Sequence, residues 1–95
     1  MPAIGSLTLE MEFVDSHSLK DKRQWVRGLK DRLRAGFNVS VAEVDDQNLL
    51  NRSTICVVTV SGSRENAAKI LDEVERAAAG FLGPALVSAT IYWLD

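Results

Sequence analysis

The hydrophobic pattern of this chain switches between a period of two residues and a period of about 3.6 residues, and the order of these switches restricts the fold most. A period of two predicts a strand with one buried face, and the longer period predicts a helix with one buried side. The alternation is clearest in the first strand. The predicted elements, in order, are strand 6–13, helix 19–35, strand 37–44, strand 54–60, helix 64–79 and strand 86–94.

Short polar residues and glycines indicate where the two helices begin and end. Ser18 precedes the first helix and stands three residues before Asp21, which is the spacing of an N-cap followed by an acidic residue. Ser63 occupies the corresponding place before the second helix. Gly36 and Gly80 follow the helical patterns and are predicted to cap their C-terminal ends.

The order strand, helix, strand, strand, helix, strand matches the split βαβ, or ferredoxin-like, motif. Two right-handed crossovers place both helices on one face of a four-stranded antiparallel sheet, with the first and third strands in the middle. The third strand is apolar on both faces, which is typical of a central strand that is covered on both sides. We therefore expect an α+β protein with a single ferredoxin-like domain over residues 1–95.

Composition excludes several classes of protein. Hydrophobic residues make up 46% and charged residues 25% of the sequence, a globular balance that argues against disorder and collagen-like repeats. No apolar run approaches the roughly 20 residues of a membrane span, so no membrane partner is expected. The single Cys56 excludes an internal disulfide and a Cys-x-x-Cys metal site. We expect it to be a small core side chain in a cytoplasmic protein.

Three segments carry a resemblance to a known family. Residues 17–23 read His-Ser-Leu-Lys-Asp-Lys-Arg, residues 29–34 read Leu-Lys-Asp-Arg-Leu-Arg, and residues 37–45 read Phe-Asn-Val-Ser-Val-Ala-Glu-Val-Asp. In these segments the chain resembles the YlxP-like family of small bacterial proteins, which is classed as a domain of unknown function. The resemblance covers most of the chain, from the first helix through the second.

The resemblance implies a ferredoxin-like fold and a bacterial cytoplasmic protein. Genes of the family tend to lie beside genes for transcription and translation factors, including a ribosome-binding factor, which implies an RNA-related role. The family supplies no catalytic residue to carry over. It usually has an aromatic residue in the connection after the second strand, where this chain has Leu50. A partner contact made by that aromatic would be made differently here.

Charge is distributed unevenly along the sequence. The formal net charge is −2, yet seven of the eleven cations lie between residues 20 and 34 together with two acids, so this segment carries +5. Five of the seven recur at spacings of 3, 4, 3 and 4, which places them on the side of the first helix away from its apolar stripe. We call these five residues the basic ridge: Lys20, Arg23, Arg27, Lys30 and Arg34.

The basic ridge has two interpretations. A row of cations about 20 Å long can follow a phosphate backbone, because each neutralised phosphate releases condensed counterions. This interpretation predicts a nucleic-acid-binding site for structured or ribosomal RNA. The other interpretation is a solvated helix face whose charges aid solubility.

The open face of the sheet is not expected to bind RNA. Domains of this strand order that bind RNA on the sheet stack bases on aromatic residues of the first and third strands. Here the first strand exposes Glu10 and Glu12, and residues 54–60 contain no aromatic. The alternative prediction is that the open face forms a homodimer, in a protein-interaction or scaffold domain without a nucleic-acid role. Trp25 and Trp93 are expected to be core or interface anchors.

No catalytic constellation is visible, so we expect a protein that is not an enzyme. Asp15, Ser16 and His17 include the residue types of a catalytic triad, but adjacent residues do not readily reach its geometry. His17 with Asp45 and Asp46 is a weak set of metal ligands. We expect no metal and no small-molecule cofactor. Amino-acid sensing ranks third, because the turn before the first helix lacks the glycine usual in sensing modules of this strand order.

Overall fold

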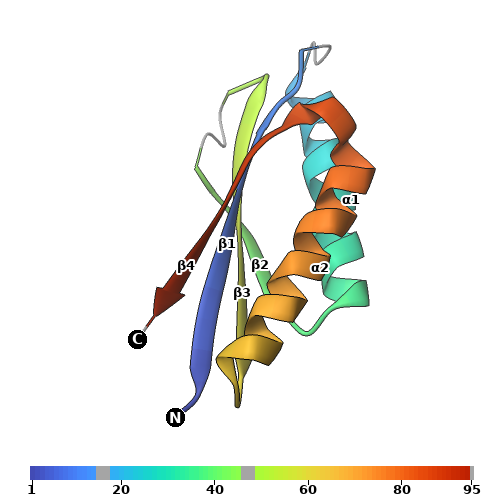
Figure 1. Ribbon diagram of the computed structural model, residues 1–95. Helices are drawn as coiled ribbons and strands as arrows, with labels where there is room; N and C mark the ends of the chain where they lie inside the picture. The colour runs from blue at the N-terminus through green and yellow to red at the C-terminus, as the bar shows by residue number, and fades with distance from the viewer. Residues whose placement is uncertain (15–17, 46–48, 95) are drawn as a thin grey trace.

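The elements of the computed structural model follow one another in the predicted order (Figure 1). The structure describes residues 1–14, 18–45 and 49–94. Two helices lie on one face of a four-stranded sheet, which confirms the predicted ferredoxin-like arrangement. The elements are β1 (Ala3–Glu12), α1 (Leu19–Gly36), β2 (Ser40–Asp45), β3 (Arg52–Ser61), α2 (Arg64–Leu82), the 3-10 turn η1 (Gly83–Ala85) and β4 (Leu86–Leu94).

The strands pair in the order β2-β3-β1-β4, and each pair is antiparallel. β1 and β3 form the centre of the sheet, as predicted. They pair without interruption from Ala3 opposite Ser61 to Glu12 opposite Arg52. The two central strands therefore set the alignment of the whole sheet, and β2 and β4 are its edges.

The core lies between the helices and the sheet. Alternate residues of β1 and β3 are buried. This confirms the period of two predicted for β1. The prediction that β3 is covered on both sides was wrong, because only its side toward the helices is buried. Each helix buries one stripe of side chains spaced three and four residues apart. Residues of the core with no exposed surface are Leu7, Leu9, Leu29, Leu33, Ile55, Val57, Ala67, Leu71, Val74 and Ala78.

Both helices begin where the sequence predicts. The Ser18 hydroxyl accepts a hydrogen bond from the Asp21 amide at 3.2 Å, and the Ser63 hydroxyl accepts one from the Asn66 amide at 3.1 Å. Each bond satisfies an amide that the first turn of a helix leaves without a backbone partner. Asp21 and Glu65 also place negative charge at the positive end of each helix dipole.

The prediction that Gly36 and Gly80 cap the two helices was wrong, because each glycine belongs to its helix. α1 includes Gly36, and its C-cap is Phe37. α2 continues through Gly80 to Leu82, and its cap is Gly83, whose φ of 57° favours glycine. The additional residues of α2 bury Leu82 in the core. This burial outweighs the cost of about 1 kcal/mol for a glycine inside a helix.

Strand limits differ from the prediction where pairing or local turns override side-chain pattern. β1 begins at Ala3, three residues before its predicted start, because it pairs with β3 along its full length. β2 begins at Ser40, three residues late. The Val39 amide donates to the Phe37 carbonyl at 3.0 Å, and this tight turn precedes the ladder. β4 has the predicted limits.

Gly5 in β1 leaves the space into which Trp93 of β4 packs. The two residues stand directly opposite each other in the β1/β4 pair. A Cβ atom at Gly5 would lie 2.8 Å from Trp93 Cζ3 and 2.9 Å from Leu71 Cδ1. The Arg64 guanidinium carbon of α2 lies 4.6 Å from the centroid of the Trp93 ring. Trp93 therefore anchors β4 to both β1 and α2.

Replacing Gly5 with valine is expected to lower the free energy of unfolding by about 1–3 kcal/mol, because the new side chain overlaps the Trp93 ring and Leu71. Urea denaturation followed by circular dichroism measures this loss. Gly36→Ala is the control, since a Cβ atom there has nothing within 4 Å and alanine is the better helix former. Equal stability of Gly5→Val and the wild-type protein would contradict this packing.

Candidate functional site

The cations of α1 fall into two groups, those held by the fold and those that face solvent. Lys22 belongs to the first group, because its side chain is 2% exposed and its Nζ donates to the Leu49 carbonyl at 2.7 Å. The same Nζ lies 3.6 Å from Oε2 of Glu43, which accepts a hydrogen bond from the Ser53 hydroxyl at 2.6 Å. Lys22 and Ser53 are buried, while Glu43 is half-buried and Leu49 contributes only its backbone carbonyl. We call these four residues the lysine cluster. It joins α1 to β2, β3 and the chain between them.

Arg32 and Arg34, in the second half of α1, also contact the fold. The Arg32 guanidinium carbon lies 4.5 Å from the centroid of the Phe81 ring, a cation–π contact with α2. Arg34 is a predicted member of the basic ridge and is exposed, but its guanidinium donates to the Val41 carbonyl of β2 at 2.8 Å. The basic ridge is therefore tied to β2 at its C-terminal end.

The remaining four members of the basic ridge share the solvent-facing side of α1. Three of them are exposed and Lys30 is half-buried. The exposed three line a shallow hollow together with Gln24. Among the residues that the structure describes, no carboxylate forms an ion pair with any of the four. We call these residues the outer ridge: Lys20, Arg23, Arg27 and Lys30.

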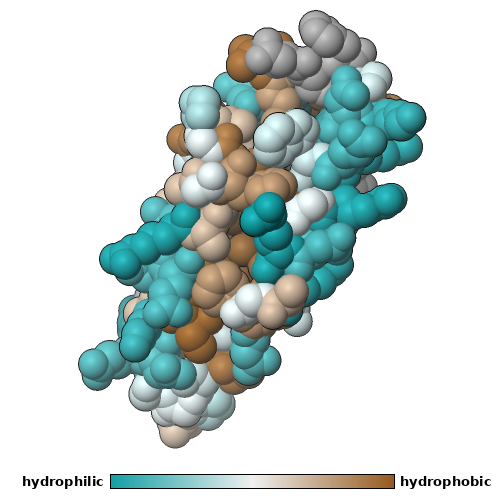
Figure 2. All heavy atoms as spheres, turned by 90° about the vertical axis from the view of Figure 1, so that its right-hand side faces the viewer, coloured by the Kyte–Doolittle hydropathy of each residue, from teal (hydrophilic) through white to brown (hydrophobic). Residues whose placement is uncertain are grey.

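The helix-covered side of the molecule combines polar and apolar surface. Figure 2 shows hydrophilic side chains in two bands on this side, with a strip of hydrophobic residues between them. A shallow hollow between the helices is lined partly by small residues, including Ala35, Gly36, Ala77 and Gly80. The charged residues of the helices therefore flank an apolar strip where the two helices meet.

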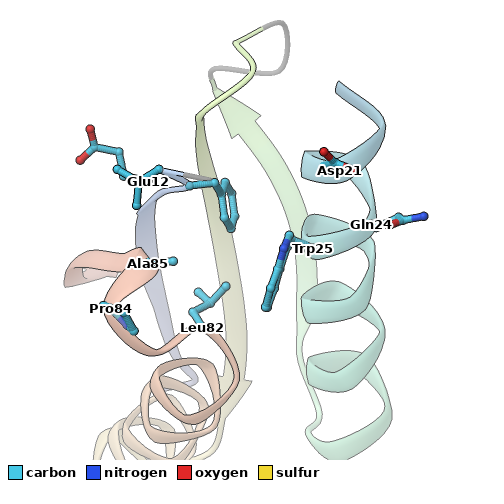
Figure 3. Close-up of a pocket in the computed structure, with 9 residues that line it drawn as sticks. Glu12, Asp21, Gln24, Trp25, Leu82, Pro84 and Ala85 are labelled. Carbon is cyan, nitrogen blue, oxygen red and sulfur yellow. The ribbon is translucent and has the colours of Figure 1, made fainter. Parts of the chain in front are cut away.

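An apolar cavity of about 350 Å³ lies where the start of α1 meets the end of β1 and the turn after α2. Figure 3 shows Trp25 and Leu82 projecting into the space between α1 and α2. Trp25 is 44% exposed and stacks on Phe13 with 6.2 Å between the ring centroids. Glu12 turns away from Trp25 in Figure 3 and pairs with Arg52 at 3.6 Å. Sequence reasoning missed this cavity, although Trp25, expected to be a core or interface anchor, was a signal for it.

The open face of the sheet is apolar at one end and acidic near the other. Ile4 of β1 stands opposite Val60 of β3 and Leu94 of β4, and Tyr92 lies next along β4 on the same face. Val60, Tyr92 and Leu94 are exposed. We call these four residues the open-face patch. Glu10 is exposed farther along β1, toward the other end of the sheet.

Cys56 lies on the open face and not in the core, so its predicted position was wrong. It is half-buried and stands opposite Thr8 in β1 and Ala42 in β2. The residues on either side of it in β3 point to the helices instead. β3 presents no aromatic side chain on the open face, as predicted.

The residues weighed for catalysis or metal binding are only partly described. Asp15, Ser16, His17 and Asp46 lie outside the described residues. Within the described ranges, no group of three or more His, Cys, Asp and Glu side chains comes together in a way that could hold a metal ion. No helix in those ranges has both the length and the apolar character needed to cross a membrane.

These features define a small ferredoxin-like domain, and solved structures share its fold. One is a dimeric ferredoxin-like protein of unknown function from Thermobifida fusca, with a TM-score of 0.52 and 15% identity over 97% of this chain and 91% of that one. Another is YXEP of Bacillus subtilis, a dinuclear metal binding peptidase from the M20 family, with a TM-score of 0.54 and 14% identity. That match covers 100% of this chain but 26% of the peptidase. At these identities the likeness shows the fold alone.

Sequence comparison identifies the family. Residues 4–91 match the family described as Protein of unknown function (DUF503). The chain is also 34% identical to the Uncharacterized protein YlxP of Bacillus subtilis (strain 168) over 71 residues, which are 75% of this chain and 77% of that protein. This protein belongs to the DUF503 family, which confirms its resemblance to YlxP-like proteins.

Replacing Lys22 with methionine keeps an unbranched apolar stem but removes the cation that faces Glu43. We expect the free energy of unfolding to fall by about 3 kcal/mol, since loss of one partner leaves a largely buried charge uncompensated. Lys20→Met is the matched control on the solvent-facing side of the same helix, and should change stability by less than about 0.5 kcal/mol. Urea denaturation compares the two variants. Equal losses would show that Lys22 does not hold α1 to the sheet.

Proposed function

We propose that this protein is a non-enzymatic binding module of the bacterial cytoplasm that contacts RNA, within a ribosomal or translation complex, through the basic ridge of α1. One observation supports the proposal above all. The outer ridge keeps four neighbouring cations out of the contacts that hold Lys22, Arg32 and Arg34 to the fold. Like charges placed close together repel each other, and an anionic partner removes that repulsion.

The length of the outer ridge suits a phosphate backbone. Lys20 and Lys30 are ten residues apart on a helix, which corresponds to about 15 Å at 1.5 Å rise per residue. Several phosphates of one strand can lie along this distance. Contacts from Lys and Arg to phosphate and ribose position a nucleic acid without reading its sequence. The proposed partner is therefore structured RNA, recognised by its shape and backbone.

The charge on the rest of the molecule favours one orientation of such a partner. Residues 20–34 carry +5, so the remainder of the chain carries −7. Glu10 exposes one of these carboxylates on the open face. Phosphate is attracted to α1 and repelled elsewhere, over distances of about 10 Å at moderate salt. The RNA-related role that the family resemblance implies agrees with this proposal.

Self-association is the second candidate function, in which the protein is a homodimeric interaction or scaffold domain and the cations only solvate α1. The open-face patch favours it, because apolar side chains from three strands are adjacent there and those from β3 and β4 are exposed. The Thermobifida fusca protein that shares the fold is itself described as dimeric. An apolar contact between copies should respond little to salt, whereas RNA binding should weaken steeply.

The variant Arg23→Glu, Arg27→Glu should bind purified ribosomal RNA at least about tenfold more weakly than the wild-type protein, because two phosphate contacts become repulsive. Filter binding over a range of salt concentrations measures both affinity and its salt dependence. The slope of log affinity against log salt should be shallower in the variant.

The matched control is Lys69→Glu, Arg76→Glu on α2, which changes the net charge by the same amount at exposed positions. This control separates the position of the charge from the total charge. If both variants lose the same RNA affinity, the loss reflects the total charge of the protein and not a binding site on α1. Equal RNA retention by the wild-type protein and a folded Arg23→Glu, Arg27→Glu variant would refute the RNA proposal.

A further inference from the structure

The outer edge of β4 has no partner strand among the residues that the structure describes. β4 pairs with β1 along one side, and Figure 1 shows it at the border of the sheet. A free edge presents unpaired backbone amides and carbonyls, and soluble proteins usually guard such edges with charges, prolines, bulges or short strands. β4 spans nine residues, Leu86–Leu94, without a charge or a proline. It is therefore a long and weakly guarded edge.

The opposite edge of the same sheet is guarded. β2 is six residues long and carries the carboxylates of Glu43 and Asp45. Its pairing with β3 shifts register between these two residues, which interrupts a regular edge. The Arg34 side chain from α1 also donates to the Val41 carbonyl. The only such device in β4 is a register shift near its start, between Leu86 and Ser88. Because the stretch Ser88–Leu94 has none of the devices that guard β2, its free edge calls for a different explanation.

Exposed apolar side chains stand on both faces of β4. Tyr92 and Leu94 point to the open face, while Ile91 is 38% exposed on the side of the helices. α2 contacts β4 near Trp93, but the rest of this side of the strand is only partly covered. A strand added at the edge would bury apolar surface on both faces and satisfy the free backbone groups at the same time.

We infer that β4 pairs antiparallel with β4 of a second copy, so that two sheets join into one of eight strands. A second copy fits because the strand is neutral throughout and meets no like charge across a two-fold axis. β4 pairs regularly with β1 over Ser88–Leu94, and the register shift opposite Glu10 and Met11 lies outside this stretch. If this stretch pairs over its full length with the same stretch of the second copy, its middle residue, Ile91, lies at the two-fold axis. Thr90 of each copy then lies opposite Tyr92 of the other.

This inference rests on the self-association of the second candidate function, but it places the contact at the edge of β4 instead of on the open-face patch. It does not require that the cations only solvate α1, so it is compatible with RNA binding. A two-fold axis perpendicular to the sheet keeps all four helices on one side. α1 packs over β2 and α2, at the part of each sheet away from β4. The two outer ridges therefore lie toward opposite ends of the joined sheet, where both remain open to solvent.

Light scattering of the full chain tests the pairing. The wild-type protein at high micromolar concentration should have the mass of two chains, twice 10.4 kDa. Ile91→Lys should have the mass of one chain, because it brings two ammonium groups together at the axis. The matched control is Val60→Lys, an apolar position in β3 that is more exposed than Ile91 and lies on the open face. This control should remain a dimer, and circular dichroism checks that both variants are folded.

The outcomes separate pairing at the edge of β4 from self-association through the open face. A dimer that Val60→Lys dissociates and Ile91→Lys does not would place the contact on the open face and overturn edge pairing, while self-association would stand. A single-chain mass for the wild-type protein would overturn both edge pairing and self-association.

Crosslinking gives a second measurement: in a Cys56→Ser background, Ile91→Cys should form a disulfide-linked dimer on oxidation. Opposite residues of antiparallel strands lie within disulfide reach, at Cα distances of about 4.5–5.5 Å. Failure to crosslink in a dimer would refute the register.

Discussion

The ion pair between Lys22 and Glu43 is the interaction on which the arrangement of the surfaces depends. Lys22 occupies a buried position on the same stripe of α1 as the leucines of the core. Its ammonium group reaches Glu43 in β2 and the Leu49 carbonyl, and Glu43 in turn accepts a hydrogen bond from Ser53 in β3. A buried charge is tolerated only when such partners surround it, so α1 has one favourable rotation about its axis. That rotation turns the outer ridge to solvent.

The sequence also shows where pattern reasoning is sufficient and where it is not. Alternation predicted β1 because its two faces have different environments, and serine caps predicted the helix starts because the capping bond is local. Glycines did not predict the helix ends, since burial of Leu82 draws α2 past Gly80. β2 began late because a turn at Phe37 depends on backbone geometry and not on side-chain polarity. Local sequence signals therefore predicted the helix starts and β1. The end of α2 depends on tertiary burial, and the start of β2 depends on backbone geometry.

The candidate site could be predicted from the sequence only in part. Spacing placed five cations on one side of α1, and the structure keeps four of them facing solvent but gives Arg34 a partner in β2. That partner depends on the distance between α1 and β2, which spacing within one helix cannot supply. The buried position of Lys22 could have been predicted from the sequence, because Lys22 stands four residues before Val26 and therefore falls on the apolar stripe. A lysine at a core position is itself a signal for a buried acid, here Glu43.

The two edges of the sheet connect this electrostatic arrangement with the proposed assembly. α1 covers the sheet near β2, and Arg34 contacts that edge, so the cationic helix and the guarded edge lie together. β4 is neutral and lies away from α1, where neither a phosphate backbone nor the outer ridge interferes with a second copy. The proposed pairing at β4 leaves both outer ridges exposed on one side of the joined sheet. Two weak phosphate-binding surfaces joined rigidly bind one large RNA more tightly than either does alone, provided that the RNA spans both of them. In the proposed assembly, a chain of 95 residues would hold an RNA through phosphate contacts that are weak singly.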